Sequence, residues 1–325
     1  MSQHNDLQTA KKNKKDEFYT SLTDIEKEMK NYTSQFKGKI VFCNCDDPEY
    51  SMFWKYFQLN FQYLGLKKLI ATHFDYEKPT YKLEYDGIDI KKSDLQQNGD
   101  FRSPECLEIL SKCDIVCTNP PFSMFHEFID VLMKSGKQFI IIGNINAVKY
   151  SDVFPYIMDG KLWLGQSIHS GDREFRVPDD YPLNASSSRI DENGVKYIRV
   201  KGVRWFTNMD YNERHDPMIL YKHYTEEEYP HYDNYDAIEV SKTAEIPGDY
   251  NGIMGVPITA LDKLNFDQFE LLGMTDRQNT SGLRTKKYTS EDNPKFNDLN
   301  AGCVIKQPDG TFKSLYTRFL IKRKG

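Results

Sequence analysis

Apolar and polar positions follow two alternating periods along the first half of the chain. Short continuous apolar runs, typical of strands buried on both faces, are separated by amphipathic stretches with the spacing of helices. The apolar runs predict strands at 39–45, 68–74, 114–118 and 138–142. A hairpin is predicted over 81–90, because Leu83 and Tyr85 alternate with polar residues ahead of a turn at Asp86-Gly87.

Capping residues mark the ends of the predicted helices. Ser51 and Ser103 are predicted N-caps, and proline follows Ser103 at the first helical position. Gly65 and Gly136 are placed to end helices. The predicted helices span about 51–64, 103–112 and 124–135. A start at Thr23-Asp24 is predicted for a further helix.

The order of these elements predicts an α/β domain with a largely parallel sheet. Such sheets bind ligands outside the carboxyl ends of their strands. Polar clusters follow two of the predicted strands, at 44–49 and at 119–123. Beyond residue 147 the regular pattern weakens, and this half is interpreted as a smaller, loop-rich module.

Composition narrows the class of protein. None of the apolar runs in the 325 residues approaches the length of a membrane span, so a membrane protein is not expected. The first fifteen residues are polar and lysine-rich, unlike a secretory signal. The six cysteines show no metal-ligand spacing, and Cys43 and Cys45 are expected to face the core of their strand. A reducing, cytoplasmic location follows. The seven histidines form no cluster, so no metal site is expected, and Trp205 is expected in the core.

Charge is segregated along the chain. The net charge is −5, but residues 223–250 hold eight acidic side chains against one lysine, so the rest of the chain is net positive. Residues 277–325 hold eleven Lys or Arg against four Asp or Glu, a net charge of +7. Both ends of the chain are basic, which permits an anionic partner such as nucleic acid.

The run Asn119-Pro120-Pro121-Phe122 is the strongest local signal for chemistry. The side-chain carbonyl of Asn119 and the backbone carbonyl of Pro120 can accept the two hydrogens of a planar amine and favour a tetrahedral nitrogen. Two prolines stiffen the loop, and Phe122 offers a face on which a base can stack. The structural alternative is a rigid turn with Phe122 in the core, and the position between a buried strand and a helix favours the catalytic interpretation.

With this loop the chain resembles the EcoRI-type adenine-specific DNA modification methyltransferases. The resemblance runs from about residue 14 to the C-terminus and rests on several further stretches. These are Asp16 to Thr20 (DEFYT), Cys43 to Pro48 (CNCDDP), Gly99 to Ser103 (GDFRS), Asp114 to Ser123 (DIVCTNPPFS), Phe139 to Asn144 (FIIIGN), Tyr232 to Ala237 (YDNYDA) and Asp249 to Pro257 (DYNGIMGVP).

The resemblance implies a Rossmann-like methyltransferase sheet with a C-terminal recognition region. It also implies S-adenosylmethionine as the donor, S-adenosylhomocysteine as the product, and the exocyclic amine of adenine in double-stranded DNA as the target. The expected divisions are a basic flexible N-terminus at 1–15, a donor-binding and catalytic domain at 16–160, and a target-recognition region at 161–325 that can add strands to the main sheet. No metal and no membrane are expected, and a monomer is the family expectation.

The resemblance also implies roles for single residues. Asn119, Pro120, Pro121 and Phe122 match the catalytic loop. The candidates for donor binding are Phe18, Tyr19, Thr20, Cys45, Asp47, Pro48, Asp75, Asp100 and Phe101. Among these, Asp75 is the candidate for the ribose hydroxyls, with Glu77 as an alternative, and Asp100 for the amine of the donor adenine. Where most relatives have a glycine-rich donor loop, Asp47-Pro48 is followed by no glycine.

Arg284, Lys286 and Lys287 are the candidates for DNA contacts, with a solvated surface loop as the alternative. Two other functions stay open at this point. One is methylation of another planar amine, on RNA adenine, cytosine or protein glutamine. The other is an inactive DNA-binding regulator, which the missing glycines favour and the intact catalytic loop opposes. The DNA sequence recognised and the existence of a cognate restriction enzyme do not follow from the sequence.

Overall fold

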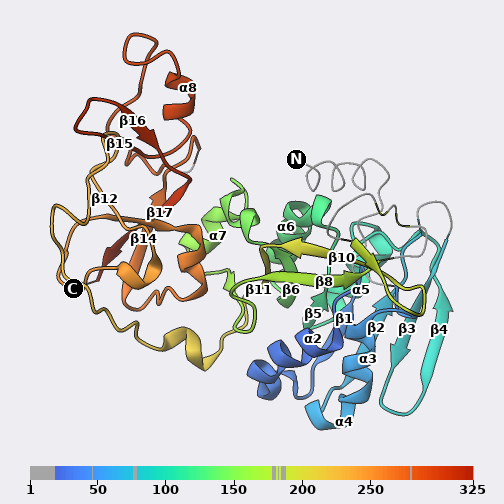
Figure 1. Ribbon diagram of the computed structural model, residues 1–325. Helices are drawn as coiled ribbons and strands as arrows, with labels where there is room; N and C mark the ends of the chain where they lie inside the picture. Colours follow the sequence, from blue (N-terminus) through green and yellow to red (C-terminus); the bar gives the residue numbers. More distant parts are fainter. Residues whose placement is uncertain are drawn as a thin grey trace. The chain divides into compact units, whose positions relative to one another are not determined.

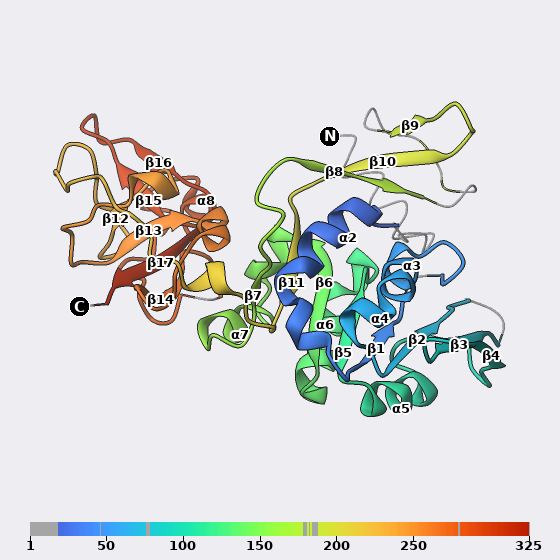
Figure 2. The same ribbon diagram turned by 90° about the horizontal axis from the view of Figure 1, so that it is seen from below.

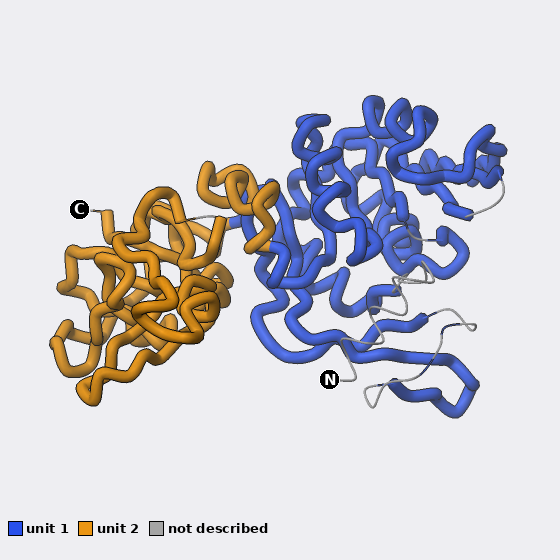
Figure 3. The backbone as a smooth tube through the Cα atoms, turned by 90° about the horizontal axis from the view of Figure 1, so that it is seen from above, with its two compact units in different colours: residues 1–147, 163–211 blue, residues 148–162, 212–325 orange. Residues whose placement is uncertain are grey.

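The computed structural model describes residues 19–45, 47–75, 79–177, 181, 183, 188–278 and 280–324. Two compact units divide the chain (Figure 3): residues 1–147 with 163–211 form the first, and residues 148–162 with 212–325 form the second. The chain therefore enters the second unit near residue 148, returns to the first at 163 and leaves it again at 212. The functional boundary expected near residue 160 stays a prediction.

An eight-stranded mixed sheet forms the centre of the first unit (Figure 1). β1 pairs in parallel with β2 and β5, and β5 with β6, whereas the remaining neighbours are antiparallel. In spatial order the strands are β4 (Ile90–Asp94), β3 (Tyr81–Tyr85), β2 (Lys68–Thr72), β1 (Ile40–Cys43), β5 (Ile115–Thr118), β6 (Gln138–Asn144), β11 (Val203–Thr207) and β7 (Trp163–Leu164). The predicted strands and hairpin are confirmed, and β7 and β11 join the main sheet from the second half of the chain. The expectation of a largely parallel sheet is wrong, because the β3–β4 hairpin and the strands β11 and β7 pair antiparallel.

Helices cover both faces of this sheet (Figure 2). They are α2 (Leu22–Met29), α3 (Met52–Leu59), α4 (Phe61–Leu64), α5 (Pro104–Lys112) and α6 (Phe125–Ser135). Ser51 and Ser103 are the N-caps, and Gly65 and Gly136 end α4 and α6 in the left-handed conformation, as predicted. The helix predicted over 51–64 breaks at Asn60, and Ser21 caps α2 in place of the predicted start at Thr23-Asp24.

Core contacts in the first unit show which elements pack on each face of the main sheet. Side chains of α2 and α3 share one cluster with β1, β2, β5, β6 and β11, and Trp205 is fully buried in it, as expected. A separate three-stranded sheet packs into the same cluster through Phe175 and Ile198. Its strands are β8 (Asp172–Arg176), β9 (Ser188–Ile190) and β10 (Lys196–Lys201). On the opposite face, Phe125 of α6 meets Phe206 edge to face, with ring centroids 4.9 Å apart.

The second unit is built around a four-stranded sheet in the order β12 (Ile238–Glu239), β13 (Met254–Pro257), β17 (Arg318–Arg323) and β14 (Phe269–Met274). The smaller elements are α7 (Phe154–Met158), α8 (Phe296–Leu299) and the two-stranded sheet of β15 (Val304–Lys306) and β16 (Phe312–Ser314). A nearly buried ion pair joins Arg318 to Glu239 at 2.8 Å, and the hydroxyl of Tyr232 donates to the same carboxylate. These bonds tie β12 to β17.

One sequence expectation about the strand ends is wrong. Cys43 is buried as expected, but Cys45 lies beyond the end of β1 and is partly exposed. Its backbone has φ of 71°, in the left-handed region, so it cannot continue the alternation of the strand. The six cysteines all lie within the described residues, and none of them forms a disulfide bond.

Candidate functional site

The two polar clusters predicted at strand ends meet in the first unit. β1 and β5 are parallel neighbours, so their carboxyl ends lie at the same edge of the sheet. The hydroxyl of Thr118, the last residue of β5, donates to the backbone carbonyl of Asn44, which follows β1. Asn119 is therefore held next to the start of the predicted donor loop, and Asn119 itself is only 4% exposed.

The catalytic-loop candidates continue from Asn119 into a short helical turn. Pro120 is buried, and the carbonyl of Pro121 accepts from the backbone N–H of Met124 at 3.0 Å. Phe122 is partly buried, and its ring meets Phe175 of β8 edge to face at 6.4 Å. Phe122 thus packs against the core on one side while remaining partly exposed, so the catalytic and structural interpretations both describe part of its environment.

The predicted donor loop takes its shape from Asp47. The backbone carbonyl of Asp47 accepts from the N–H groups of Tyr50 and Ser51, at 3.0 and 2.7 Å. One oxygen of its carboxylate, Oδ1, accepts from the N–H of Glu49 at 2.9 Å. A side chain that caps its own turn in this way fixes a loop without glycine. This accounts physically for the absence of glycines after Asp47-Pro48.

The second carboxylate oxygen of Asp47 faces β2 and β3. Its Oδ2 lies 3.7 Å from Nε2 of His73, and the hydroxyl of Tyr81 also hydrogen-bonds to the carboxylate. Burial, together with the negative charges of Asp47 and Glu49, raises the pKa of Tyr81 to about 12, so the hydroxyl stays protonated and donates. Sequence reasoning missed His73 and Tyr81 because their partnership with Asp47 arises only from strand pairing.

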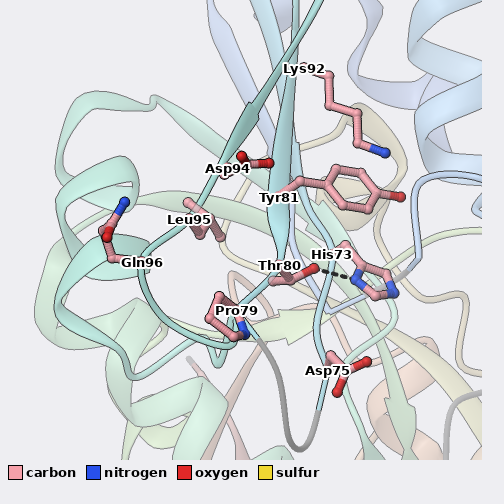
Figure 4. A pocket seen from close by; sticks show the side chains of 9 residues that line it. All are labelled: His73, Asp75, Pro79, Thr80, Tyr81, Lys92, Asp94, Leu95 and Gln96. Carbon is pink, nitrogen blue, oxygen red and sulfur yellow. Dashed lines mark hydrogen bonds between the residues drawn. The ribbon is translucent and has the colours of Figure 1, made fainter.

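A pocket of about 660 Å³ adjoins this group (Figure 4). His73 stacks on Tyr81 at 5.0 Å with an interplanar angle of 7°, and Lys92 lies over the Tyr81 ring at 3.6 Å. The hydroxyl of Thr80 hydrogen-bonds to Nδ1 of His73, as the dashed line in Figure 4 shows. Asp75, the candidate for the donor ribose, lines the same pocket. Glu77 lies outside the described residues.

The next two donor candidates, Asp100 and Phe101, already have partners in the protein. Arg102 donates three hydrogen bonds to the carboxylate of Asp100, from N and Nε to Oδ1 and from Nη2 to Oδ2. Burial would raise the pKa of Asp100, but the bonds from Arg102 outweigh it and hold the pKa below its usual value. An ionised carboxylate has about four lone-pair positions, so one acceptor position is left for a ligand. Phe101 is buried and meets Phe128 edge to face at 5.0 Å.

The N-terminal donor candidates reach the site through β8. The N–H of Tyr19 donates to the carbonyl of Arg176 at 2.9 Å, and the Tyr19 ring lies 5.9 Å from the ring of Tyr50 in the predicted donor loop. Phe18 lies outside the described residues. Thr20 is 2% exposed, and its hydroxyl has no hydrogen-bond partner within the described residues. The same holds for Oδ1 of Asn44, which is 3% exposed. These two buried polar groups have no partner in the described part of the protein, so they are suited to bind a polar ligand.

The basic candidates for DNA contact lie in the second unit. The guanidinium of Arg284 donates to the hydroxyl of Tyr235 at 3.1 Å and to the carbonyl of Asp276 at 2.8 Å. Lys286 forms an ion pair with Asp233 at 2.9 Å, whereas Lys287 is exposed. Arg284 and Lys286 therefore support the fold of their own loop, which leaves Lys287 as the candidate most open to solvent.

Within the residues that the structure describes, no three His, Cys, Asp or Glu side chains are grouped to hold a metal ion. The site instead combines a mixed sheet whose central strands β2, β1, β5 and β6 are parallel, a polar loop after β1 and an Asn-Pro-Pro-Phe loop after the adjacent β5. These features are those expected of an amino-methyltransferase, because α/β sheets bind their ligands at the carboxyl ends of the strands.

Comparison with known proteins gives the family. Residues 6–324 match the family described as "Adenine-specific methyltransferase EcoRI", and the chain belongs to this family. The chain is 47% identical to Type II methyltransferase M.EcoRI of Escherichia coli over 288 residues, which cover 82% of this chain and 88% of the relative. It is 40% identical to Type II methyltransferase M.MgeORF184P of Mycoplasma genitalium over 323 residues, covering 97% and 98%. It is 42% identical to Type II methyltransferase M.MpnI of Mycoplasma pneumoniae over 267 residues, covering 81% and 83%.

The expected family, fold class and adenine-specific activity are thereby confirmed. The chain is a DNA-modifying methyltransferase specific for adenine, and enzymes of this class take their methyl group from S-adenosylmethionine. Its described helices include none with the length and apolar character needed to cross a membrane.

Proposed function

We propose that the enzyme methylates adenine in double-stranded DNA at the edge of the main sheet, with Asn119 as the group that activates the amine. The observation that carries this proposal is the burial of Asn119 directly after β5, beside the end of β1. In this assignment the enzyme acts as a monomer in the cytoplasm and requires no metal ion.

Asn119 and Pro120 would act on the target nitrogen. The lone pair of an exocyclic purine amine is delocalised into the ring, which makes the amine a poor nucleophile. The side-chain carbonyl of Asn119 and the backbone carbonyl of Pro120 would accept its two hydrogens and localise the lone pair. Pro121 restricts the preceding residue to extended conformations and so fixes the direction of the Pro120 carbonyl.

Phe122 would hold the target base. Adenine in a duplex cannot reach a buried asparagine, so it must leave the stack, at a cost of a few kcal/mol. The ring of Phe122 is braced by Phe175 and partly exposed, and it can replace part of the lost stacking.

The residues that would hold the donor surround the Asp47 loop. S-adenosylmethionine supplies an electrophilic methyl group on a sulfonium centre. We assign the buried polar groups of Thr20 and Asn44 to its methionine end, with Tyr19, Cys45 and Pro48 beside them. Asp75 would bind the ribose hydroxyls, and Asp100 and Phe101 would contact the adenine. Asp47 would act through the shape of the loop, because its carboxylate is already bound by Glu49, His73 and Tyr81.

This role of Asp47 gives a testable expectation for Tyr81. Tyr81→Phe removes the hydroxyl that holds Asp47 but keeps the ring that stacks on His73. Losing one hydrogen bond worth about 1 kcal/mol should weaken binding of S-adenosylhomocysteine about fivefold, as measured by calorimetry. Tyr85→Phe, on the same strand, is the matched control and should leave the affinity unchanged. Equal affinity of the Tyr81→Phe and wild-type proteins would show that Asp47 needs no support from β3.

For DNA binding we propose that the basic loop at 284–287 contacts the phosphate backbone through Lys287. Arg284 and Lys286 would maintain the loop through Tyr235 and Asp233. A lysine that contacts a phosphate releases counterions, so its loss lowers the slope of log K against log salt by about one unit.

Lys287→Ala should therefore weaken binding to every DNA sequence and flatten this slope by about one, without a change in donor affinity. Fluorescence anisotropy with a labelled duplex over a range of salt concentrations measures both effects. Lys263→Ala, in the same unit, is the control for a lysine outside this loop. A slope identical to that of the wild-type protein would assign Lys287 to the solvated surface.

One experiment tests the proposed function as a whole. Cells that express the chain should carry N6-methyladenine at one short DNA sequence, and cells that express an Asn119 variant should not. Sequencing that detects modified bases in both strands identifies the site at the same time. Methylated RNA, cytosine or protein with unmodified DNA would favour another planar amine as substrate. Sequence-specific DNA binding without any modification would favour an inactive regulator.

A further inference from the structure

Arg176, at the end of β8, lies where three parts of the site meet. Its carbonyl accepts from the N–H of Tyr19, and its guanidinium lies over the ring of Tyr50 in the donor loop, 5.0 Å from the ring centroid. The preceding residue, Phe175, contacts Phe122 of the catalytic loop. The Arg176 side chain is therefore placed beside the donor loop, on the strand that braces the catalytic loop.

The charge of Arg176 is not neutralised by the part of the protein that the structure describes. Its Nε is buried without a hydrogen-bond acceptor, and no described carboxylate lies within ion-pairing distance. The other arginines of this small sheet differ. Arg189 pairs with Glu174 at 2.5 Å, Arg199 lies 3.8 Å from the same carboxylate, and Arg173 lies 3.7 Å from Asp24. A partly buried cation without an anion is costly, so the position calls for an anionic ligand.

We propose that Arg176 binds the carboxylate at the methionine end of the methyl donor. This inference rests on the proposed function, because it takes the loop at 47–51 as the donor loop. The donor carries one anionic group, and the planar guanidinium can bind a carboxylate through two parallel hydrogen bonds. The contacts of Arg176 with Tyr19 and Tyr50 place it on the donor side of the site. The unsatisfied hydroxyl of Thr20, next in sequence to Tyr19, is suited to accept from the ammonium group of the same α-amino acid end.

The proposed contact between Arg176 and the carboxylate can be measured with two ligands that differ only in that carboxylate. S-adenosylhomocysteine carries the carboxylate, and its decarboxylated analogue keeps the adenosine, the sulfur and the amine. By calorimetry, the wild-type protein should bind S-adenosylhomocysteine about 10- to 100-fold more tightly than the analogue, the range expected for hydrogen bonds to a charged group. Arg176→Gln should lose this preference by weakening only the binding of S-adenosylhomocysteine, and Arg176→Lys should recover part of it.

Arg199→Gln on β10 is the matched control and should keep the full preference. Equal affinity of the wild-type protein for the two ligands, or an equal loss of both in Arg176→Gln, would overturn the assignment. If Arg176→Gln bound S-adenosylhomocysteine like the wild-type protein but showed a flatter salt dependence of DNA binding, the assignment would be overturned in favour of a contact between Arg176 and a DNA phosphate. Failure of the wild-type protein to bind S-adenosylhomocysteine at all would instead count against the proposed donor site, which keeps the two conclusions separate.

Discussion

Asn119→Ala should abolish methyl transfer while leaving the affinities for donor and DNA nearly unchanged. The side-chain carbonyl of Asn119 is assigned to an interaction that strengthens as the amine becomes tetrahedral, so its loss should raise the barrier without removing ground-state binding. Removal of one such polar group typically costs about 10²- to 10³-fold in rate. Single-turnover transfer of radioactive methyl groups to a saturating DNA duplex measures the chemical step.

Two further variants separate catalysis from folding. Asn119→Asp preserves the size of the side chain but introduces a charge at a site that is 4% exposed, and it should also be inactive. Asn193→Ala, at an exposed turn, is the control and should transfer methyl groups at the wild-type rate. If Asn119→Ala kept more than about a tenth of the wild-type single-turnover rate, the loss would be under about 1.4 kcal/mol and the assigned role would be wrong.

Much of the main sheet could be predicted because its strands are buried on both faces. The apolar runs at 39–45, 114–118 and 138–142 correspond to β1, β5 and β6, and cap residues mark the helices between them. The same pattern predicts polar clusters at two strand ends, and the bond between Thr118 and Asn44 shows that these two ends are neighbours in the sheet.

The remaining elements depend on long-range pairing that local sequence does not encode. β11 is separated from its partner β6 by more than fifty residues, and part of the intervening chain, 148–162, belongs to the other compact unit. The expected strand position of Cys45 failed for a local reason. Its backbone adopts the left-handed conformation just beyond the end of β1, and no glycine marks that position in the sequence.

In the candidate site, too, local motifs could be predicted from the sequence and long-range contacts could not. A loop motif is contiguous and can be found by inspection, whereas the partners of a carboxylate come from other strands. The sequence predicts Asp47 as a donor-loop residue, but its bonds to His73 and Tyr81 could not be predicted. Arg284 and Lys286 show the converse, since a basic run that resembled a DNA-binding loop is partly engaged with Tyr235 and Asp233. The net charge of a segment can be counted from the sequence, but the count does not show which side chains are already paired within the protein.

A second large effect is expected at Glu28, a fully buried carboxylate of α2. It accepts hydrogen bonds from the hydroxyl of Tyr32 at 2.8 Å and from the N–H groups of Gln166 and Ser167 at 3.0 and 2.7 Å. These bonds fasten the segment that leads from β7 into β8, and β8 carries Phe175 and Arg176. The close packing leaves no space beside it, since a Cβ on Gly165 would lie 2.2 Å from Oε1 of Glu28.

Glu28→Ala should lower the free energy of unfolding by about 3–5 kcal/mol, because one buried and two partly buried donors lose their acceptor and a cavity is left. Urea denaturation followed by circular dichroism measures the change. Glu26→Ala, on the exposed face of the same helix, is the matched control and should change the stability by less than about 0.5 kcal/mol. A loss below about 1 kcal/mol in Glu28→Ala would mean that water replaces the carboxylate and that the segment at 165–167 does not depend on it.

The same residue predicts how stability changes with pH. Burial raises the pKa of Glu28 above its ordinary value of 4.5, although the bonds from Ser167, Tyr32 and Gln166 oppose the shift. The folded protein therefore keeps a proton that the unfolded chain releases. This contribution to stability is fully present below about pH 4.5 and is lost as the pH rises through the higher native pKa. Glu28→Gln cannot titrate, so the difference in unfolding free energy between the wild-type protein and Glu28→Gln should shift against the wild-type protein as the pH rises above 4.5, the ordinary pKa of the carboxyl. A difference that stayed constant with pH would show that Glu28 has the same pKa in the folded and unfolded protein.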